Sequence, residues 1–285
     1  MKKMSILINS QEYTIIKEIG KGAFGKVFKL EKNNKYFALK QIPISELADI
    51  DRLKKEVNIL SKFDSDNIIK YLSYSNDQKY FNILMEYGGD LNLKQFIKKY
   101  KDKSELIEEE NITKIIMQIY LGLREIHQAN IIHRDLTPEN IFINENDMKI
   151  KIGDFGVSKI LGPNYNYAKS GTGKMFYNAP EILKGQKYNK SIDIYAFGCI
   201  IYELFTLNEY FLDNFYGDKK AKINTDIYNP KWQELIDSLC KEDYHQRSSI
   251  DGIYEKLKKF DSDKKLVVRI FHFIMSARYN IFIIL

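Results

Sequence analysis

Cysteine is scarce in this chain, and its scarcity limits the kinds of site that the chain can build. The 285 residues include two cysteines, Cys199 and Cys240, and neither belongs to a C-x-x-C pair. Disulfide scaffolds and zinc sites need more cysteines at closer spacing. We therefore expect neither, and we expect a reducing, cytoplasmic compartment.

Long blocks of like charge are also missing. The net charge of +6 is dispersed rather than gathered into long Lys/Arg runs. Such runs are typical of surfaces that bind nucleic acid, so we expect no nucleic-acid partner. The first thirteen residues lack the apolar core and the small-residue cleavage site of a signal peptide.

An apolar segment near the C-terminus, 266–285, is about as long as a membrane span. It contains Arg269, His272 and Arg278, and charged side chains are costly inside a bilayer. We expect a packing helix or a poorly ordered tail there, with attachment to a membrane as the alternative.

Two hydrophobic patterns divide the rest of the chain. Up to about residue 90, four segments rich in β-branched and aromatic residues predict strands, with turn residues Asn33 and Asn34 between the second and third. One helix is predicted among them, from about 45 to 63. Later spacing is helical, and the segment 192–205 is apolar almost all round, which predicts a buried central helix. The outline is α+β, with a small β-rich lobe followed by a larger, mainly helical one.

A glycine-rich stretch, "GKGAFGKV" (20–27), fits the pattern G-x-G-x-x-G-x-V. Dinucleotide-binding folds share G-x-G-x-x-G, but they require a helix after the glycines, and here the following residues are strand-like. Gly20, Gly22 and Gly25 would let backbone N–H groups approach phosphate oxygens. The alternative is a hairpin turn that binds nothing.

Several charged and polar residues suit a nucleotide and a metal ion. Lys40 in "FALK" could reach phosphates, and Glu56 on the predicted helix could pair with it. A solvated lysine and a surface ion pair are the alternatives for these two residues. Asp154 in "DFG" and Asn140 offer the oxygen ligands that Mg²⁺ prefers.

An aspartate, Asp193, lies on the almost wholly apolar segment 192–205. A buried charge is expensive unless it is hydrogen-bonded. We expect Asp193 to accept hydrogen bonds from buried donors, which the backbone of 133–135 could provide.

Together, the order and spacing of these motifs resemble a eukaryotic protein kinase domain over residues 13–258. The matching stretches are "GKGAFGKV", "FALK", Glu56, "HRDLTPEN", "DFG", "APE", "DIYAFG" and the arginine of "HQRSS". The resemblance implies the bilobal kinase fold, with an N-lobe at about 13–85, a hinge at 86–90 and a C-lobe at 91–258. A hydrophobic, basic tail at 259–285 would follow.

The resemblance also implies an activity. We expect a protein kinase that uses ATP and Mg²⁺ and transfers the γ-phosphoryl group to a protein substrate. "DLTPEN" keeps the Pro-Glu-Asn of serine/threonine kinases, which favours Ser/Thr hydroxyls. "IKIGDFG" and "ENIFI" are similar to NIMA-related and eIF2α-type kinases, although they assign no subfamily. A pseudokinase that serves as an ATP-binding or scaffolding module is the alternative.

By this resemblance, Asp135 is the catalytic base, Lys40 and Glu56 form the ion pair that aligns ATP, and Asn140 and Asp154 hold Mg²⁺. Glu181 and Arg247 would form a buried structural ion pair. The residues that would surround the nucleotide are Gly20, Lys21, Gly22, Ala23, Phe24, Gly25, Val27, Ala38, Lys40, Met85, Glu86, Tyr87 and Phe142.

Arg134, directly before the catalytic base, implies regulation. Kinases with an arginine at this position are commonly controlled by phosphorylation of the activation segment, because the guanidinium can pair with a phosphate. Counting back from "APE" makes Ser170 the phosphosite, with Thr172 as the alternative. Lys159 would be a second phosphate partner.

Thr137 departs from the family pattern. Serine/threonine kinases usually carry a lysine two residues after the catalytic aspartate, where it steadies the γ-phosphate. Counting back from "APE" puts Lys174 where such kinases have a threonine, which favours an exchange: Lys174 supplies the ammonium group and Thr137 the hydroxyl. The alternative alignment takes Gly171 and Thr172 as the usual Gly-Thr pair, and it implies no replacement for the lysine.

Overall fold

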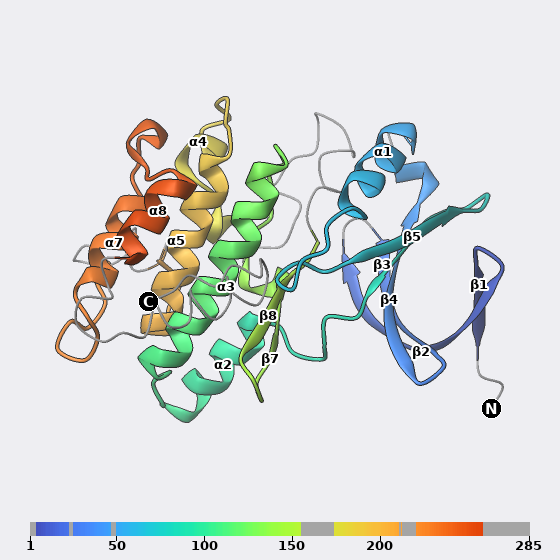
Figure 1. Cartoon of the computed structure of the whole chain (residues 1–285), viewed down its shortest axis with the longest axis horizontal. Helices are drawn as coiled ribbons and strands as arrows, with labels where there is room; N and C mark the ends of the chain where they lie inside the picture. The colour runs from blue at the N-terminus through green and yellow to red at the C-terminus, as the bar shows by residue number, and fades with distance from the viewer. Residues whose placement is uncertain are drawn as a thin grey trace, which may run out of the picture.

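Strands and helices are segregated along the chain, as predicted. The computed structural model describes residues 4–22, 25–46, 50–154, 174–210, 212 and 221–258. The chain folds into a β-rich lobe and a larger helical lobe, and the segment between β6 and α2 runs from one to the other (Figure 1). The predicted α+β, bilobal architecture is confirmed.

The β-rich lobe contains an antiparallel sheet in the order β1-β2-β3-β4-β6-β5. Its strands are β1 (Ser5–Ile8), β2 (Gln11–Gly22), β3 (Gly25–Lys32), β4 (Lys35–Pro43), β5 (Tyr71–Asn76) and β6 (Tyr80–Glu86). Positive φ angles at Asn33 (51°) and Asn34 (59°) allow the tight turn between β3 and β4. The predicted turn is therefore confirmed. β1, which pairs with β2 through a similar turn at Asn9 and Ser10, lies ahead of the strands expected from the sequence.

One α-helix accompanies this sheet. It is α1 (Ile50–Leu60), and a short 3-10 helix, η1 (Ile44–Glu46), precedes it. Leu53, Val57 and Leu60 are buried, so the predicted apolar spacing faces the core. The helix ends three residues before the predicted boundary at 63, because the backbone N–H of Phe63 turns back to the carbonyl of Leu60 and closes a turn.

The helical lobe is built around a buried helix. Its α-helices are α2 (Leu93–Lys103), α3 (Glu109–Gln128), α4 (Pro180–Leu183), α5 (Ser191–Thr206), α7 (Lys231–Leu239) and α8 (Ile250–Lys258). Its short 3-10 helices are η2 (Pro138–Asn140), η5 (Lys174–Tyr177) and η6 (Tyr244–Gln246). Every residue of α5 from 192 to 205 is buried, which confirms the predicted central helix.

A short hairpin, β7 (Ile141–Asn144) and β8 (Lys149–Ile152), lies beside α3 on the side that faces the β-rich lobe (Figure 1). It meets that lobe through Ile152, whose carbonyl accepts a hydrogen bond from the N–H of Ile69 at 2.8 Å. The "HRDLTPEN" loop precedes β7 and "DFG" follows β8, so the hairpin holds both ends of the candidate site at the junction of the lobes.

Among the residues that the structure describes, no helix combines the length and the apolar character needed to cross a membrane. The segment 266–285, for which a packing helix, a tail or membrane attachment was considered, lies outside the described residues.

Candidate active site

Asp193 accepts hydrogen bonds from the backbone of the loop that carries Asp135. The Asp193 side chain is almost fully buried, and its two oxygens accept hydrogen bonds from the backbone N–H groups of His133 (2.8 Å) and Arg134 (2.9 Å). The prediction that the 133–135 backbone supplies buried donors is confirmed. His127, which the sequence did not single out, lies 2.9 Å from the same carboxylate through its Nε2.

His133 links this loop to the end of β8. Its ring is completely buried, and burial lowers its pKa below the ordinary value, despite the neighbouring carboxylates of Asp193 and Asp135. A neutral imidazole has one donor and one acceptor nitrogen. Nε2 is 3.0 Å from the carbonyl of Gly153 and therefore donates, while Nδ1 accepts from the backbone N–H of Asp135 at 3.3 Å.

Asp135 and Asn140 lie side by side. The Nδ2 of Asn140 donates to the backbone carbonyl of Asp135 at 2.7 Å and to its carboxylate at 2.9 Å. Because both contacts use the amide nitrogen, the amide oxygen of Asn140 points away from Asp135. The backbone N–H of Gly153 also donates to the carbonyl of Asn140 at 2.8 Å, which brings Asp154 next to this pair.

Lys40 reaches the same place from the other lobe. Its ammonium nitrogen is 2.7 Å from Oδ1 of Asp154, although 114 residues separate the two in the sequence. The Lys40 side chain is 9% exposed and that of Asp154 37%, so the carboxylate end of this ion pair reaches solvent while the ammonium end is nearly buried. The side chain of Glu56, the partner predicted for Lys40, is outside the described part of the structure.

Asn140 and Asp154 fit the predicted magnesium site. Mg²⁺ is usually held by one or two protein oxygens together with phosphate oxygens and water. The outward amide oxygen of Asn140 and the partly exposed carboxylate of Asp154 offer such ligands. The described residues contain no cluster of three or more His, Cys, Asp or Glu side chains suited to a metal ion. A magnesium ion held by these two residues would take phosphate oxygens and water as its remaining ligands.

Several residues predicted around the nucleotide lie on neighbouring strands of the sheet. Val27 pairs with Lys40 across β3 and β4, and Ala38 pairs with Met85 across β4 and β6. Partners directly opposite in an antiparallel sheet project to the same face. Gly25 has a φ of 131°, and a Cβ there would lie 1.8 Å from the carbonyl oxygen of Gln41, so the end of the glycine-rich stretch needs glycine.

The ring of Phe142, on β7, lies against the hinge. A Cβ added at Gly88 would lie 2.6 Å from the Cγ of Phe142, so the hinge backbone passes directly over that ring. The neighbouring Glu86 uses its N–H for the carbonyl of Lys70 at 2.8 Å. Gly20 and Lys21 lie on β2, opposite Val27 and Lys26 of β3. The residues predicted around the nucleotide thus lie on one face of the β-rich sheet, together with Lys40, and on β7 against the hinge.

The sequence model of the protein kinase domain matches residues 13–257. The chain belongs to the protein kinase family. Among solved structures, the kinase domain is similar to the crystal structure of Rad53 residues 1–466 in complex with AMP-PNP, with a TM-score of 0.68, 25% sequence identity and coverage of 85% of this chain and 63% of that chain.

Curated relatives of this kinase domain are NIMA-related serine/threonine kinases, in agreement with the predicted likeness. It is 33% identical over 258 residues to human serine/threonine-protein kinase Nek5 and 36% identical over 241 residues to the probable serine/threonine-protein kinase nek2 of Dictyostelium discoideum. These matches cover 86% and 81% of this chain. The chain spans 36% of the human relative and 57% of the Dictyostelium one.

Thr137, the residue that departs from the family pattern, is buried. Thr137 is 2% exposed, and its hydroxyl is buried without a hydrogen-bond partner among the described residues. It lines a small pocket beside Asp135 together with Tyr177 and Ala179. A buried hydroxyl without a partner loses about 1–3 kcal/mol of solvation. The side chain of Lys174, its predicted exchange partner, lies outside the described residues.

Glu181 and Arg247 form the predicted ion pair of the kinase fold. Two nitrogens of Arg247 contact the two carboxylate oxygens of Glu181 at 2.6 and 2.7 Å, and both side chains are buried. Arg247 also donates to the backbone carbonyls of Lys241 and Ser191, and lies 5.0 Å from the ring centroid of Tyr195. This prediction is confirmed.

A second buried network was missed from the sequence. Lys94, in the first turn of α2, contacts Glu203 of α5 at 2.7 Å and Glu209 at 2.6 Å. Glu203 is 1% exposed and also accepts a hydrogen bond from the hydroxyl of Tyr177. Burial raises the pKa of both Tyr177 and Glu203. No local spacing could signal this network, because α2, η5 and α5 are far apart in the sequence.

Part of the predicted site cannot be placed. The described residues leave out Ala23, Phe24, Lys159, Ser170 and Thr172, and the side chains of Glu56 and Lys174. Arg134, the predicted phosphate partner, is described: its φ is 68°, and its buried Nε has no hydrogen-bond partner among the described residues.

Proposed function

We propose that this kinase domain transfers the γ-phosphoryl group of ATP to serine or threonine hydroxyls of a protein substrate, in a reaction that requires Mg²⁺. One observation carries the proposal: Asp135, Asn140, Asp154 and Lys40, taken from separate parts of the chain, meet at the junction of the lobes. The names of the curated relatives and the AMP-PNP in the similar solved structure support it.

In this reaction Asp135 accepts the proton of the attacking hydroxyl as the new phosphoester bond forms. Asn140 keeps the Asp135 carboxylate in position, because its amide nitrogen holds both the carboxylate and the carbonyl of that residue. Lys40 brings an ammonium group to the phosphates, and the backbone amides of Gly20, Gly22 and Gly25 would face the same oxygens. Mg²⁺, held by Asn140 and Asp154, would offset the negative charge of the phosphates.

The decisive experiment measures transfer of labelled phosphate from ATP to a generic protein, followed by analysis of the phosphorylated amino acids. Asp135→Ala should abolish the transfer while AMP-PNP still binds, because the removed carboxylate acts on the hydroxyl and not on the nucleotide. Phosphoserine or phosphothreonine is expected in the product. Wild-type protein that binds AMP-PNP without transferring phosphate would instead establish a pseudokinase.

We further propose that phosphorylation at Ser170 or Thr172 activates the domain, with Arg134 and Lys159 as phosphate partners. The buried Arg134 Nε, unpartnered among the described residues, supports an anion arriving at this loop. A Ser170→Ala/Thr172→Ala double variant should lose most of its activity. Equal activity of this variant and fully phosphorylated wild type would overturn the proposal.

Lys174 is proposed to replace the missing catalytic-loop lysine, with the Thr137 hydroxyl as its partner. The partnerless Thr137 hydroxyl supports this, because such a group needs a donor or acceptor nearby. Lys174→Ala should lower kcat about tenfold or more, as expected for loss of a charge close to the transferred phosphoryl group. The double variant Thr137→Lys/Lys174→Thr should recover part of that loss. An unchanged kcat in Lys174→Ala would contradict the exchange.

The proposed unit of function comprises residues 13–258, with lobes at 13–85 and 91–258 around the hinge 86–90. Since the chain spans 36% of its human relative, protein substrates and partners are to be sought with the full-length protein. A reducing, cytoplasmic compartment remains part of the proposal, because both cysteines are free thiols in the structure.

A further inference from the structure

A lysine of the β-rich lobe is held in an aromatic cage at the hinge. Lys29 of β3 is 8% exposed, and its ammonium nitrogen lies 4.4 Å from the ring centroid of Tyr36 and 4.3 Å from that of Tyr87. The same nitrogen contacts both carboxylate oxygens of Asp90, at 3.0 and 3.2 Å. The hydroxyl of Tyr87 donates to Asp90 at 2.5 Å. The two aromatic rings and the carboxylate therefore all stabilise the Lys29 ammonium group.

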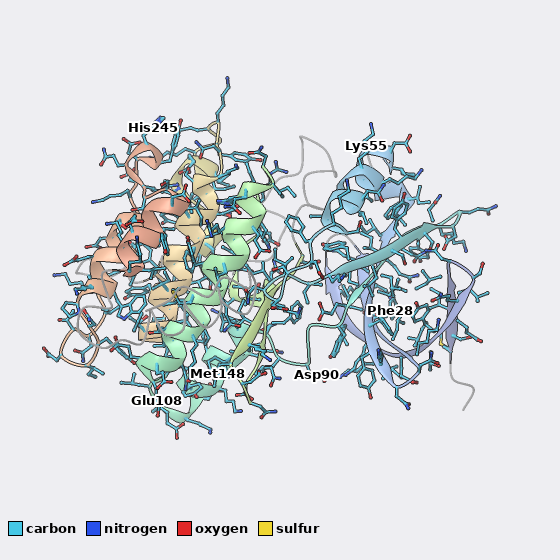
Figure 2. The ribbon with its side chains drawn as sticks, viewed as in Figure 1. Phe28, Lys55, Asp90, Glu108, Met148 and His245 are labelled. Carbon is cyan, nitrogen blue, oxygen red and sulfur yellow. The ribbon has the colours of Figure 1, made fainter. Side chains whose placement is uncertain are left out.

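Lys29 lies on the face of the sheet that carries Val27, Ala38 and Lys40, which are predicted to surround the nucleotide. It pairs with Ala38 across β3 and β4, two positions along from the pair of Val27 and Lys40. Since side chains alternate along a strand, Lys29 projects to the same face as Lys40. Asp90 is the last residue of the hinge and lies at the junction of the lobes (Figure 2). The contact between Lys29 and Asp90 therefore joins the β-rich lobe to the end of the hinge that leads into the helical lobe.

A second ion pair joins the helical lobe to the first residue of the hinge. Lys151 belongs to β8 of the helical lobe, and its ammonium nitrogen is 3.1 Å from Oε2 of Glu86, the last residue of β6 in the β-rich lobe. Their side chains are 28% and 35% exposed. The same Glu86 oxygen is 3.3 Å from the backbone nitrogen of Lys70. Each lobe thus contributes a lysine that binds an acid at the end of the hinge farther along the chain from that lobe.

We propose that these crossed ion pairs form a clamp that fixes the angle between the lobes and prepares the nucleotide site, with Lys29 and Lys151 as positioning residues. The hinge between Glu86 and Asp90 contains two glycines, Gly88 and Gly89. Glycine leaves the backbone more freedom than any other residue. Side-chain contacts are therefore needed to hold the lobes, and a site held in its binding geometry loses less free energy on ordering when the nucleotide enters.

The protonation states support a permanent clamp. Hydrogen bonds from Tyr87 and Lys29 lower the pKa of Asp90, so its carboxylate is charged at neutral pH. Burial acts to lower the pKa of Lys29, but Asp90 and Tyr87 outweigh it, and the net pKa is raised. Burial and the bond to Asp90 raise the pKa of Tyr87 to about 12, which keeps its hydroxyl as a donor. Charge-assisted hydrogen bonds of this kind are about twice as strong as neutral ones.

The test compares Lys29→Met, Lys151→Met and the double variant with a matched control, Lys32→Met. Lys32 is a lysine of the same strand that also contacts a ring, that of Tyr13, but its hydrogen bond is to the neutral amide oxygen of Gln11, and both partners belong to its own lobe. Each clamp variant should weaken the affinity for AMP-PNP about fivefold and the double variant further, because Lys151→Met loses a charged contact and Lys29→Met loses a charged contact and two cation–π contacts. KM for ATP should rise with them, while kcat changes less than about twofold.

A second measurement does not depend on nucleotide. Amide hydrogen exchange of residues 87–92 in the free protein should be faster in Lys29→Met and Lys151→Met than in wild type and in Lys32→Met. The inference rests on the proposed ATP-binding function, but hydrogen exchange in the free protein tests the clamp separately from nucleotide binding. Wild-type protein that binds no nucleotide would remove the proposed function, whereas exchange still tests the clamp.

Two outcomes would overturn the clamp. One is hinge exchange in both variants that equals that of the control. The other is a loss of affinity no larger than that caused by Lys32→Met. Lys151→Met is the informative variant if Lys29→Met fails to fold, because Lys151 is 28% exposed and its removal leaves no buried polar cage.

Discussion

Single buried polar residues hold the candidate site in place. Asp193 accepts the backbone N–H groups of His133 and Arg134, and the ring of His133 bonds to Gly153. Asp135 itself is held by the amide of Asn140. The reacting group is therefore oriented by neighbours that are themselves buried and bonded, which is what an active site needs to keep its geometry.

Removal of the Asp193 carboxylate should destabilise the domain strongly. Asp193→Ala leaves buried N–H groups of His133 and Arg134 without an acceptor, each at a cost of about 1–3 kcal/mol. We expect a loss of about 3 kcal/mol or more in the free energy of urea unfolding. Asp102→Ala, at a largely exposed ion pair with Lys98, is the control and should cost less than about 1 kcal/mol. Equal losses in both variants would contradict the role of Asp193.

His133 should make stability depend on pH. Its folded pKa is lowered, so between that value and the unfolded value near 6.5 the unfolded chain binds a proton that the folded chain does not. The stability is complete above about pH 6.5 and is lost as the pH falls towards the folded pKa. His133→Phe should reduce the slope of unfolding free energy against pH between 5 and 6.5 by up to one proton. An unchanged slope in this variant would contradict the buried neutral ring.

At the scale of elements, α2 begins and ends with side-chain and backbone devices that its sequence encodes. Asn92 caps the N-terminus: its side chain accepts from the N–H of Gln95 at 2.9 Å, and the Gln95 side chain accepts from the N–H of Asn92 at 3.0 Å. Ser104 closes the C-terminus with a left-handed φ of 55°. Because α2 follows the hinge and carries Lys94, its start affects both the hinge and the buried network.

Substitutions at the two ends of α2 should have opposite signs. Asn92→Ala removes the capping box and should cost about 1 kcal/mol of unfolding free energy. Ser104→Gly should stabilise by about 0.5 kcal/mol, because glycine adopts positive φ without the steric cost that serine bears. Chemical denaturation of both variants measures the difference. Stabilisation by Asn92→Ala, or a loss of more than about 1 kcal/mol in Ser104→Gly, would contradict these cap assignments.

At the scale of the whole molecule, buried charges connect elements that no local pattern relates. Lys94 of α2 meets Glu203 of α5, and Glu203 meets Tyr177, which lies beside the pocket next to Asp135. Burial raises the pKa of Glu203, while Lys94 opposes that rise. Lys94 thus offsets the free-energy cost of the buried Glu203 carboxylate at the contact between α2 and α5.

Lys94→Met should therefore cost about 3 kcal/mol at neutral pH, since it leaves Glu203 as a buried carboxylate without its cation. Without the lysine, the folded pKa of Glu203 rises further. The protonated form is favoured in the folded state, so the variant recovers stability as the pH falls through that pKa. Lys94→Met/Glu203→Gln should regain part of the loss at neutral pH. Urea unfolding at pH 5 and pH 8 measures both effects, and a loss that does not change with pH would contradict this account.

The sequence by itself determined the division into lobes, the buried central helix and the identity of the motif residues. These follow from local properties: β-branched strands before residue 90, an apolar run at 192–205 that can only be buried, and charged residues at fixed spacing around Asp135 and Asp154. Even the hydrogen-bond requirement of Asp193 could be predicted, because a charge on an apolar helix needs donors wherever it lies.

Only the tertiary structure decided which charges meet. Lys40 contacts Asp154 across 114 residues, Lys29 contacts Asp90 across 61, and Lys94 contacts Glu203 across 109. The strand β1 and the end of α1 at Leu60 also differ from the expectation, since a pairing edge and a closing turn depend on neighbouring backbone. A lysine carries the same charge and length at every position in a sequence. Its partner is set by the packing of whole elements, because an ion pair between them requires a separation of a few ångströms that spacing along the chain does not encode.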